Sequence, residues 1–280
     1  MKIVVTGATG YLGRELVRQL DGSGYEIYAS TSAPEKAKAI FRMHDVHILS
    51  NENLLNGREV IDENCIIIHG AFCRMSVGVG LAQSLDFSRR LFQTAVENRA
   101  AGILNLSSQS VYGSEKAILG VEGSELSPGY LYALAKCGAE ELLRQAVHFS
   151  KGATAGCSLR LASLMGPTDT VPQNVLYKFV CSALAGENLS IVGGTQKFSF
   201  LDVRDAAQAI TLLLQKTPDS WKPVYNLGPD EQTGITEMAA LVRDEAEKVT
   251  GKKVDILVQP DEKHALNAGM DSSLLYQDLG

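Results

Sequence analysis

The first 165 residues alternate short apolar runs with stretches in which apolar side chains recur every three or four positions. Short apolar runs rich in β-branched residues predict buried strands, and the helical spacing between them predicts amphipathic helices. The expected strands are residues 2–6, 25–30, 46–49, 65–69, 103–107 and 157–161. The expected helices are one that begins at Tyr11 and others at 35–43, 84–98 and 131–149. This regular alternation predicts an α/β fold with a doubly wound parallel sheet.

The alternation becomes irregular after Gly166 and Pro167. The periodicity there predicts helices at 175–185, 205–215 and 236–250. Short apolar runs predict strands at 191–192, 198–203, 224–227 and 254–258. We therefore expect a second, smaller α/β lobe after residue 165.

Composition removes several classes of protein. The 280 residues carry 26 Lys and Arg against 32 Asp and Glu, and this net charge of −6 gives no basic footprint for nucleic acid or an anionic membrane. No apolar run approaches the roughly 20 residues of a membrane helix, and because the folded pattern begins at Lys2 we expect no signal peptide. The five Cys and five His lack disulfide-framework or metal-ligand spacing, so we expect no metal and a cytoplasmic location.

A glycine-rich turn joins the first expected strand to the first expected helix. Gly7 allows a tight turn, Gly10 lets a pyrophosphate approach the backbone, and Gly13 lets the helix pack closely on the sheet. The helix N-terminus then offers unpaired N–H groups and a positive dipole end to phosphate groups. Because the motif follows a strand and opens a helix, it predicts nucleotide binding.

The spacing of this turn, G-x-x-G-x-x-G after Thr6, resembles the short-chain dehydrogenase/reductase superfamily. Four later segments are similar to landmarks of its extended branch, the NAD-dependent epimerase/dehydratase family. They are CIIIHGA at 65–71, LSSQSVYG at 106–113, LRLASLMGP at 159–167 and YNLG at 225–228. The segments follow one another in the family's order from end to end of the chain.

The resemblance implies an NAD(P)-binding Rossmann domain at 1–165 and a mainly substrate-binding lobe at 166–280, with 198–228 returning to the Rossmann sheet. It also implies which residues contact the cofactor. These are Gly7, Thr9, Gly10, Tyr11, Leu12, Gly13, Thr31, Ser32, Gly70, Ala71, Ser107, Tyr132 and Lys136.

Two Y-x-x-x-K pairs compete for the catalytic role that the resemblance implies, Tyr112 with Lys116 and Tyr132 with Lys136. Tyr112 precedes Gly113 at the end of an expected strand, whereas Tyr132 and Lys136 share one face of an expected helix. We therefore expect Tyr132 as acid/base, with Lys136 lowering the Tyr pKa. The family pattern places a hydroxyl partner at Ser108, with Ser107 and Ser110 as close competitors.

The expected second strand ends without the carboxylate that usually binds the adenosine ribose of NAD. Thr31 stands at that position and Ser32 follows it, with Lys36 nearby. A 2′-phosphate would be neither repelled by a carboxylate nor held by an Arg. The pattern allows NAD or NADP, with a slight preference for NADP.

Several positions depart from the family pattern. Gln109 and Ser110 replace the Asp-Glu pair of its 4,6-dehydratases, which disfavours dehydration. Phe198 replaces an Arg that grips the substrate diphosphate, while Ser163 and Ser84 replace two Asn. The candidate substrate-binding residues are Cys73, Arg74, Ser108, Gln109 and Ser163.

Three functions follow from these residues. The first is an enzyme of epimerase type that moves a hydride to and from a nucleotide sugar, and the second is an NADPH-dependent carbonyl reductase for another small molecule. The third, a non-catalytic nucleotide sensor, fits less well because Tyr132 and Lys136 are both present. A homodimer could form through helices 84–98 and 131–149. A segment from Asp271 is similar to a late family landmark, and the chain is expected to be short at its C-terminus.

Overall fold

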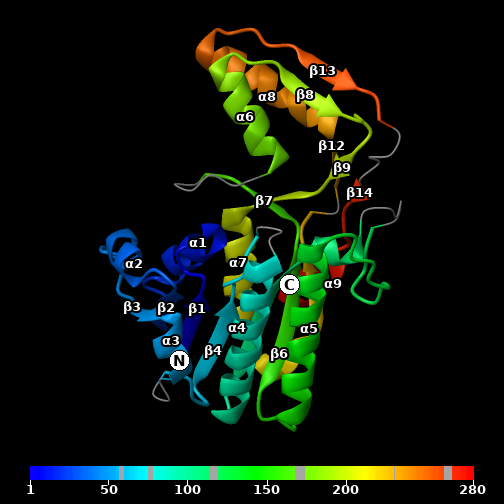
Figure 1. The fold of residues 1–280 in the computed structure, drawn as a ribbon. Coiled ribbons are helices and arrows are strands. Elements are labelled where there is room, and N and C mark those ends of the chain that lie inside the picture. Colours follow the sequence, from blue (N-terminus) through cyan, green and yellow to red (C-terminus); the bar gives the residue numbers. More distant parts are fainter. Residues whose placement is uncertain (57–59, 75–77, 114–118, 168–173, 230, 262–266) are drawn as a thin grey trace.

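The computed structural model describes residues 1–56, 60–74, 78–113, 119–167, 174–229, 231–261 and 267–280. A parallel sheet flanked by helices forms one half of the molecule, and a smaller lobe sits at one end of that sheet (Figure 1). The expected α/β class and the parallel sheet are confirmed.

Seven parallel strands form the main sheet in the order β11-β6-β5-β4-β1-β2-β3. Their bounds are β1 Lys2–Thr6, β2 Glu26–Thr31, β3 His47–Ser50, β4 Cys65–His69, β5 Gly102–Ser108, β6 Ala155–Leu161 and β11 Val224–Leu227. Thr6 is level with Ser30 on one side and with His69 on the other. The carboxyl ends of the central strands therefore meet at one edge, where open α/β sheets bind their ligands.

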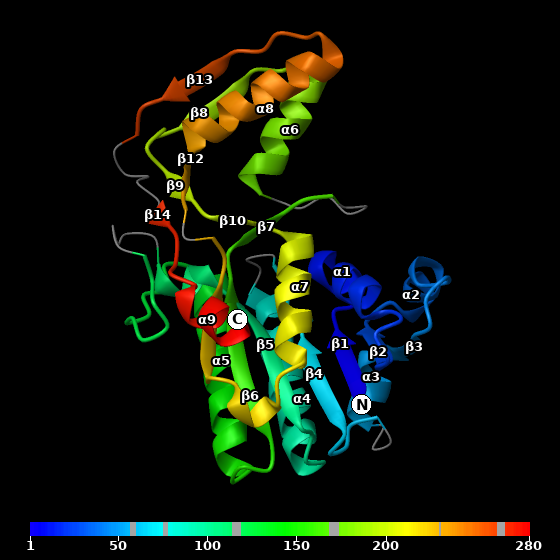
Figure 2. The same ribbon diagram turned by 180° about the vertical axis from the view of Figure 1, so that it is seen from behind.

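Helices cover both faces of this sheet (Figures 1 and 2). One face packs against α1 Tyr11–Leu20 and α7 Val203–Leu214, and the other against α3 Asn51–Asn56, α4 Gly78–Glu97 and α5 Leu131–Phe149. The remaining elements of this half are α2 Pro34–Ile40, the 3-10 turns η1 Gln109–Tyr112 and η2 Pro218–Ser220, and α9 Ser273–Leu279. Strands β1 and β4 are buried from both sides, which explains their uninterrupted apolar runs.

The smaller lobe has its own apolar core between α6 and α8 (Figure 2). Its elements are β7 Ser163–Met165, α6 Val175–Ala185, β8 Leu189–Val192, β9 Lys197–Phe198, β10 Phe200–Asp202, β12 Thr233–Gly234, α8 Ile235–Thr250, β13 Ile256–Gln259 and β14 Asn267–Ala268. Strand β10 pairs with β7 at the junction with the main sheet. From there the chain runs into α7, and β11 then pairs with β6 in the main sheet.

Some expected elements have different bounds. The strand expected at 198–203 is divided, and α7 begins at Val203 instead of residue 205 because the Asp202 side chain accepts a hydrogen bond from the Arg204 N–H. Helix α2 ends at Ile40, three residues earlier than expected, and α3 and β7 were not expected. The strand expected at 254–258 lies at Ile256–Gln259. The segment that begins at Asp271 contains a helix, α9, which the sequence pattern did not predict.

Candidate active site

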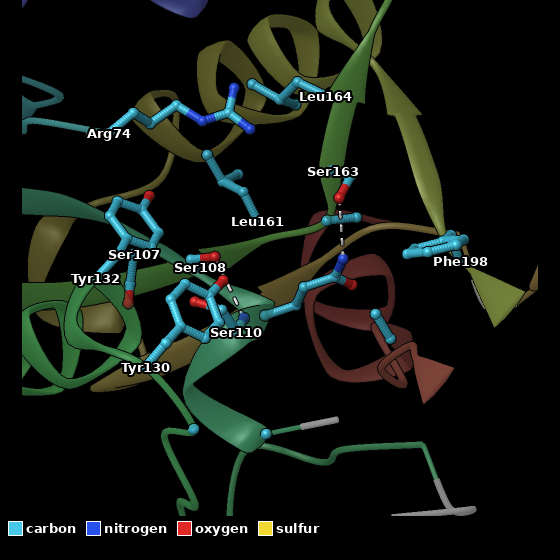
Figure 3. Close-up of a pocket in the computed structure, with 15 residues that line it drawn as sticks. Arg74, Ser107, Ser108, Ser110, Tyr130, Tyr132, Leu161, Ser163, Leu164 and Phe198 are labelled. Atoms are coloured by element: carbon cyan, nitrogen blue, oxygen red, sulfur yellow. Dashed lines mark hydrogen bonds between the residues drawn. The ribbon is translucent and has the colours of Figure 1, made fainter. Parts of the chain in front are cut away.

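A cavity of about 570 Å³ opens where the carboxyl edge of the main sheet meets the smaller lobe (Figure 3). Its lining comes from the segment after β4, from the ends of β5 and β6, from η1, from the start of α5 and from the smaller lobe. The lining residues are Arg74, Ser107, Ser108, Gln109, Ser110, Gly113, Gly129, Tyr130, Tyr132, Leu161, Ala162, Ser163, Leu164, Phe198 and Ala268. The expected residues Ser108, Arg74, Gln109 and Ser163 therefore line the same cavity as Tyr132. Ser107, an expected cofactor residue, lines it too.

Lys136 lies one helical turn beyond Tyr132 on α5 and is buried, with 4% of the residue exposed. Its Nζ donates to the Leu106 carbonyl oxygen at 2.7 Å and lies 3.9 Å from the centre of the Phe72 ring. The Tyr132 ring centre is 5.8 Å from the same nitrogen. Burial lowers the pKa of Lys136 to about 7, although the nearby charge of Glu140 opposes this shift.

Tyr132 lies in the first turn of α5, and its ring packs against those of Phe72 and Tyr130. Burial raises the pKa of Tyr132 to about 12, while the charge of Arg74 and a hydrogen bond with Ser108 act in the opposite direction. Without further positive charge the phenol therefore stays protonated at neutral pH. A cationic group bound beside it would have to supply the remaining stabilisation of a phenolate.

The three neighbouring serines have different partners. The Ser107 hydroxyl donates to Glu140 Oε1 at 2.5 Å, so its proton is already used inside the protein. Ser108 Oγ accepts a hydrogen bond from the Ser110 N–H at 3.2 Å, and the Ser108 side chain acts to lower the pKa of Tyr132. Ser110 Oγ is buried with no hydrogen-bond partner among the described residues. These contacts favour Ser108 over Ser107 as the hydroxyl that faces a ligand beside Tyr132.

The competing tyrosine, Tyr112, lies outside the cavity lining. Its hydroxyl donates to Asn226 Oδ1 at 2.6 Å and accepts from Arg160 Nη1 at 2.8 Å. Both partners are buried, and only 6% of Tyr112 is exposed. Lys116 lies outside the described residues. The hydroxyl of Tyr112 is therefore saturated by structural contacts.

The glycine-rich turn has the shape that a dinucleotide phosphate requires. Gly7 adopts φ +69°, and a Cβ there would lie 2.8 Å from the backbone of Gly70 and Ala71. A Cβ at Gly13 would collide with the Gly7 carbonyl oxygen. Gly10 is the N-cap of α1 and supplies no side chain to the helix N-terminus. The N–H groups of that first turn can therefore receive a phosphate.

Thr9 and Leu12 in this segment, and Thr31 and Ser32 where β2 ends, were also expected to contact the cofactor. The Thr9 and Thr31 hydroxyl oxygens are 3.0 Å apart, and Thr31 Oγ1 also accepts from the Ala33 N–H. Ser32 is exposed, whereas Leu12 is buried in the core between α1 and the sheet. A ligand would therefore meet the backbone of Leu12 and not its side chain.

Two residues connect the turn to other parts of the site. The Tyr11 hydroxyl donates to the Gly166 carbonyl oxygen at 3.0 Å, which links α1 to the start of the smaller lobe. Thr6 Oγ1 accepts from the N–H groups of Gly70 and Ala71 at 3.2 and 3.3 Å. It also lies 2.8 Å from Nδ1 of the buried His69, whose pKa is lowered to about 3 by burial and by the charge of Lys136.

The expected substrate residues divide into two groups. Arg74 lies near Tyr132, and Ser163 lies on the opposite side, which Phe198 also lines although it was not an expected substrate residue (Figure 3). Gln109 Nε2 donates to Ser163 Oγ at 3.3 Å, and Gln109 Oε1 is buried without a partner among the described residues. Cys73 does not line the cavity, and its backbone N–H donates to Ser84 Oγ at 2.9 Å.

Comparison with known proteins adds a decisive observation. Residues 3–228 match the sequence model of the NAD dependent epimerase/dehydratase family. The chain belongs to this family. Its relatives include a dTDP-4-dehydro-6-deoxy-D-allose reductase from a Streptomyces species, 27% identical over 86% of this chain and 79% of the relative. A dTDP-glucose 4,6-dehydratase from Streptomyces griseus is 22% identical over 99% of this chain and 88% of the relative.

Among solved structures, the UDP-glucuronic acid 4-epimerase from Bacillus cereus, in complex with UDP-glucuronic acid and NAD, has a TM-score of 0.83. The match covers 100% of this chain and 93% of that one at 21% identity, and this likeness shows a shared fold. No helix among the described residues is both long and apolar enough to cross a membrane.

Sequence reasoning missed some residues that shape the site of this family member. Tyr130, Leu161, Leu164 and Ala268 line the cavity from three separate segments, and no spacing in the sequence brings these segments together. Glu140 carried a signal that was overlooked, because it follows Lys136 by four residues and so shares its helix face.

Proposed function

We propose that the chain is an NAD(P)-dependent enzyme that moves a hydride between the nicotinamide and a carbon that bears a hydroxyl or carbonyl oxygen. The observation that carries the proposal is the arrangement at the start of α5. Tyr132 and Ser108 line the cavity, and the buried Lys136 follows Tyr132 by one turn of α5. An acid/base group, a hydroxyl partner and a positive charge are the three groups that such a transfer needs beside the reacting oxygen.

In the proposed mechanism, Ser108 hydrogen-bonds the substrate oxygen and holds it against the Tyr132 hydroxyl. During oxidation the Tyr132 phenolate accepts the hydroxyl proton of the substrate, and during reduction Tyr132 returns a proton to the carbonyl oxygen. When it is bound, the nicotinamide takes or gives the hydride, and its oxidised form brings a positive charge. The Lys136 ammonium and this charge stabilise the phenolate, which is needed because burial is the main cause that raises the pKa of Tyr132 to about 12.

For the cofactor we propose a modest preference for NADP over NAD. The support is the neutral end of β2, where Thr31 is paired with Thr9 and no carboxylate would repel a 2′-phosphate. Thr31→Asp should weaken NADPH binding about tenfold and leave NADH binding little changed, because the new carboxylate repels the phosphate and accepts from a ribose hydroxyl. Fluorescence titration with both nucleotides measures this. Equal weakening of both would contradict the assignment.

For the substrate we favour a nucleotide sugar because of the family, with a non-nucleotide carbonyl compound as the second candidate. The second candidate is favoured by Phe198, which lines the cavity at the family's diphosphate-gripping position and cannot bind phosphate as an Arg would. A 4,6-dehydratase reaction is disfavoured because Gln109 and Ser110, both at the cavity, carry no carboxyl group.

Bound nucleotide distinguishes the two candidates. An epimerase recycles its cofactor, so denaturing the purified protein should release NAD or NADP in a ratio near one per chain, and UDP-glucose should be converted to UDP-galactose. A reductase must release its cofactor at each turnover. It should therefore yield no bound nucleotide, be stabilised to heat by NADPH alone and consume NADPH with a carbonyl probe such as 4-nitrobenzaldehyde. Failure of all four signals would contradict the proposed function.

We also propose a cytoplasmic location and a homodimer through α4 and α5. All five cysteines are free, which fits a reducing compartment. The exposed positions of α5 include Leu131 and Leu134, which favours an apolar contact. The exposed face of α4 is more polar, with an Arg89–Asp86 ion pair on it. Light scattering of the purified protein tests the dimer, and a monomer at micromolar concentration would contradict it.

A further inference from the structure

A buried ion pair lies directly behind the candidate active site. Glu140 of α5 and Arg160 of β6 are joined by bonds from Arg160 Nη2 to Glu140 Oε2 at 2.7 Å and from Arg160 Nε to Glu140 Oε1 at 3.0 Å. Their side chains are 9% and 5% exposed. Burying two charges is costly, and an apolar pair of similar volume is often at least as stable. The pair therefore calls for a role other than stability.

The position of Glu140 indicates that role. It follows Lys136 by four residues on α5, so the two side chains lie on one face of the helix. The Lys136 ammonium donates to the carbonyl of Leu106, and the hydroxyl of the next residue, Ser107, donates to Glu140. Among the described residues, the hydrogen bonds to the Glu140 carboxylate come from Ser107 and Arg160, and Lys136 interacts with it through charge alone.

We propose that Glu140 is a positioning residue, held in place by Arg160 and Ser107, whose negative charge keeps the buried Lys136 in its ammonium form. The inference rests on the proposed role of Lys136 in hydride transfer. Burial drives Lys136 towards the neutral amine, and a neutral amine could not stabilise the Tyr132 phenolate. Arg160 fixes the carboxylate so that it does not rotate to form a direct bond that would pull Lys136 away from Tyr132.

Other ionisable groups around Lys136 do not supply this charge. His69 at the end of β4 is buried and neutral, since its pKa lies near 3. Tyr132 on α5 is a protonated phenol at neutral pH because its pKa lies near 12. The other groups in contact with the Lys136 nitrogen carry no net charge, because Phe72 offers the face of its ring and Leu106 offers a carbonyl dipole. Glu140 is the group whose charge opposes the effect of burial on Lys136.

Direct titration of Lys136 tests the inference without any substrate. The protein is labelled with ¹³Cε-lysine, and the Lys136 signal is assigned by its loss in Lys136→Met. In wild type the titration midpoint should lie near pH 7. Glu140→Gln should lower the midpoint by about one pH unit because an opposite charge is removed. At pH 6 that shift raises the fraction of neutral amine about fivefold.

Two further variants keep the test decisive. Glu140→Gln leaves Arg160 without its partner and can fail to fold, so the double variant Glu140→Met with Arg160→Met removes both charges and retains apolar packing. Its midpoint should also fall. Glu141→Gln changes the exposed neighbouring glutamate, which pairs with Arg144, and should leave the midpoint in place.

An unchanged midpoint in the folded double variant would overturn the inference. Such a result would leave the proposed hydride transfer untouched, because that function is tested through Tyr132. If the inference holds, the alkaline limb of the pH profile for turnover, where the Lys136 ammonium is lost, should also move to lower pH in the double variant, in step with the midpoint measured by NMR.

Discussion

Two tyrosines of this protein lie near the carboxyl edge of the same sheet, but their surroundings differ. The Tyr112 hydroxyl is enclosed by Arg160 and Asn226, and the amide of Asn226 donates in turn to the carbonyls of Gly120 and Asp271. Tyr132 opens onto the cavity, where Gln109 Oε1 and Ser110 Oγ have no partner among the described residues. A saturated network fixes structure, whereas unsatisfied polar groups around a cavity await a ligand.

The largest effect should come from breaking the saturated region. Arg160→Met leaves the Glu140 carboxylate buried without its cation and removes a donor from the Tyr112 hydroxyl. We expect a loss of about 3–5 kcal/mol in the free energy of unfolding. Urea denaturation measures it, and a loss below about 1 kcal/mol would show that the network is not structural.

A smaller change in the free energy of unfolding, of opposite sign, should come from the region behind Tyr132, which opens onto the cavity. Lys136→Met removes a buried amine and should raise the free energy of unfolding by about 2–4 kcal/mol at pH 7 while activity is lost. The folded pKa of about 7 lies below the unfolded value of 10.5, so the unfolded chain binds more protons between these limits. Wild-type stability should therefore rise with pH across that window.

The gain from Lys136→Met should accordingly shrink between pH 7 and pH 10, at about 1.4 kcal/mol per pH unit. Urea denaturation of both proteins at pH 7 and pH 9.5 gives the two differences. A gain in the free energy of unfolding that stays constant with pH would mean that burial does not lower the pKa of Lys136.

The smallest effect should come from Tyr112→Phe. The change removes a hydroxyl that bonds two buried groups but leaves the ring in place, and we expect a loss of about 1–3 kcal/mol. Turnover per folded molecule should stay within about twofold of wild type. A severe loss of turnover at normal stability would reverse the roles given to the two tyrosines.

Much of the main sheet could be predicted because its elements carry their own signals. Strands β1, β4 and β11 and helices α5 and α6 have the bounds that periodicity predicts. Short elements such as α3 and β7 could not be found, because three to six residues contain too little of a period. The apolar run at 198–203 predicted one strand, but the Asp202 side chain caps α7, so the helix begins at Val203.

The site was predictable where one segment carries the chemistry. The glycine turn and the Tyr132–Lys136 pair are local patterns, and their spacing indicates their shape. The partners of Ser107 and Ser108 depend on Glu140 and Tyr132, which lie on another element, so the sequence left the serines as competitors. The apolar wall formed by Leu164, Phe198 and Ala268 arises only when the smaller lobe folds over the sheet.

The most direct test of the account is the turnover of Tyr132→Phe beside Tyr28→Phe, which alters a tyrosine on β2 whose hydroxyl bonds Glu26. Both proteins are assayed with UDP-glucose and with 4-nitrobenzaldehyde plus NADPH, and nucleotide binding is measured in parallel. We predict that Tyr132→Phe binds nucleotide as wild type does and loses about 10²–10⁴-fold in turnover, while Tyr28→Phe is unaffected. Full turnover by a folded Tyr132→Phe protein would contradict the account.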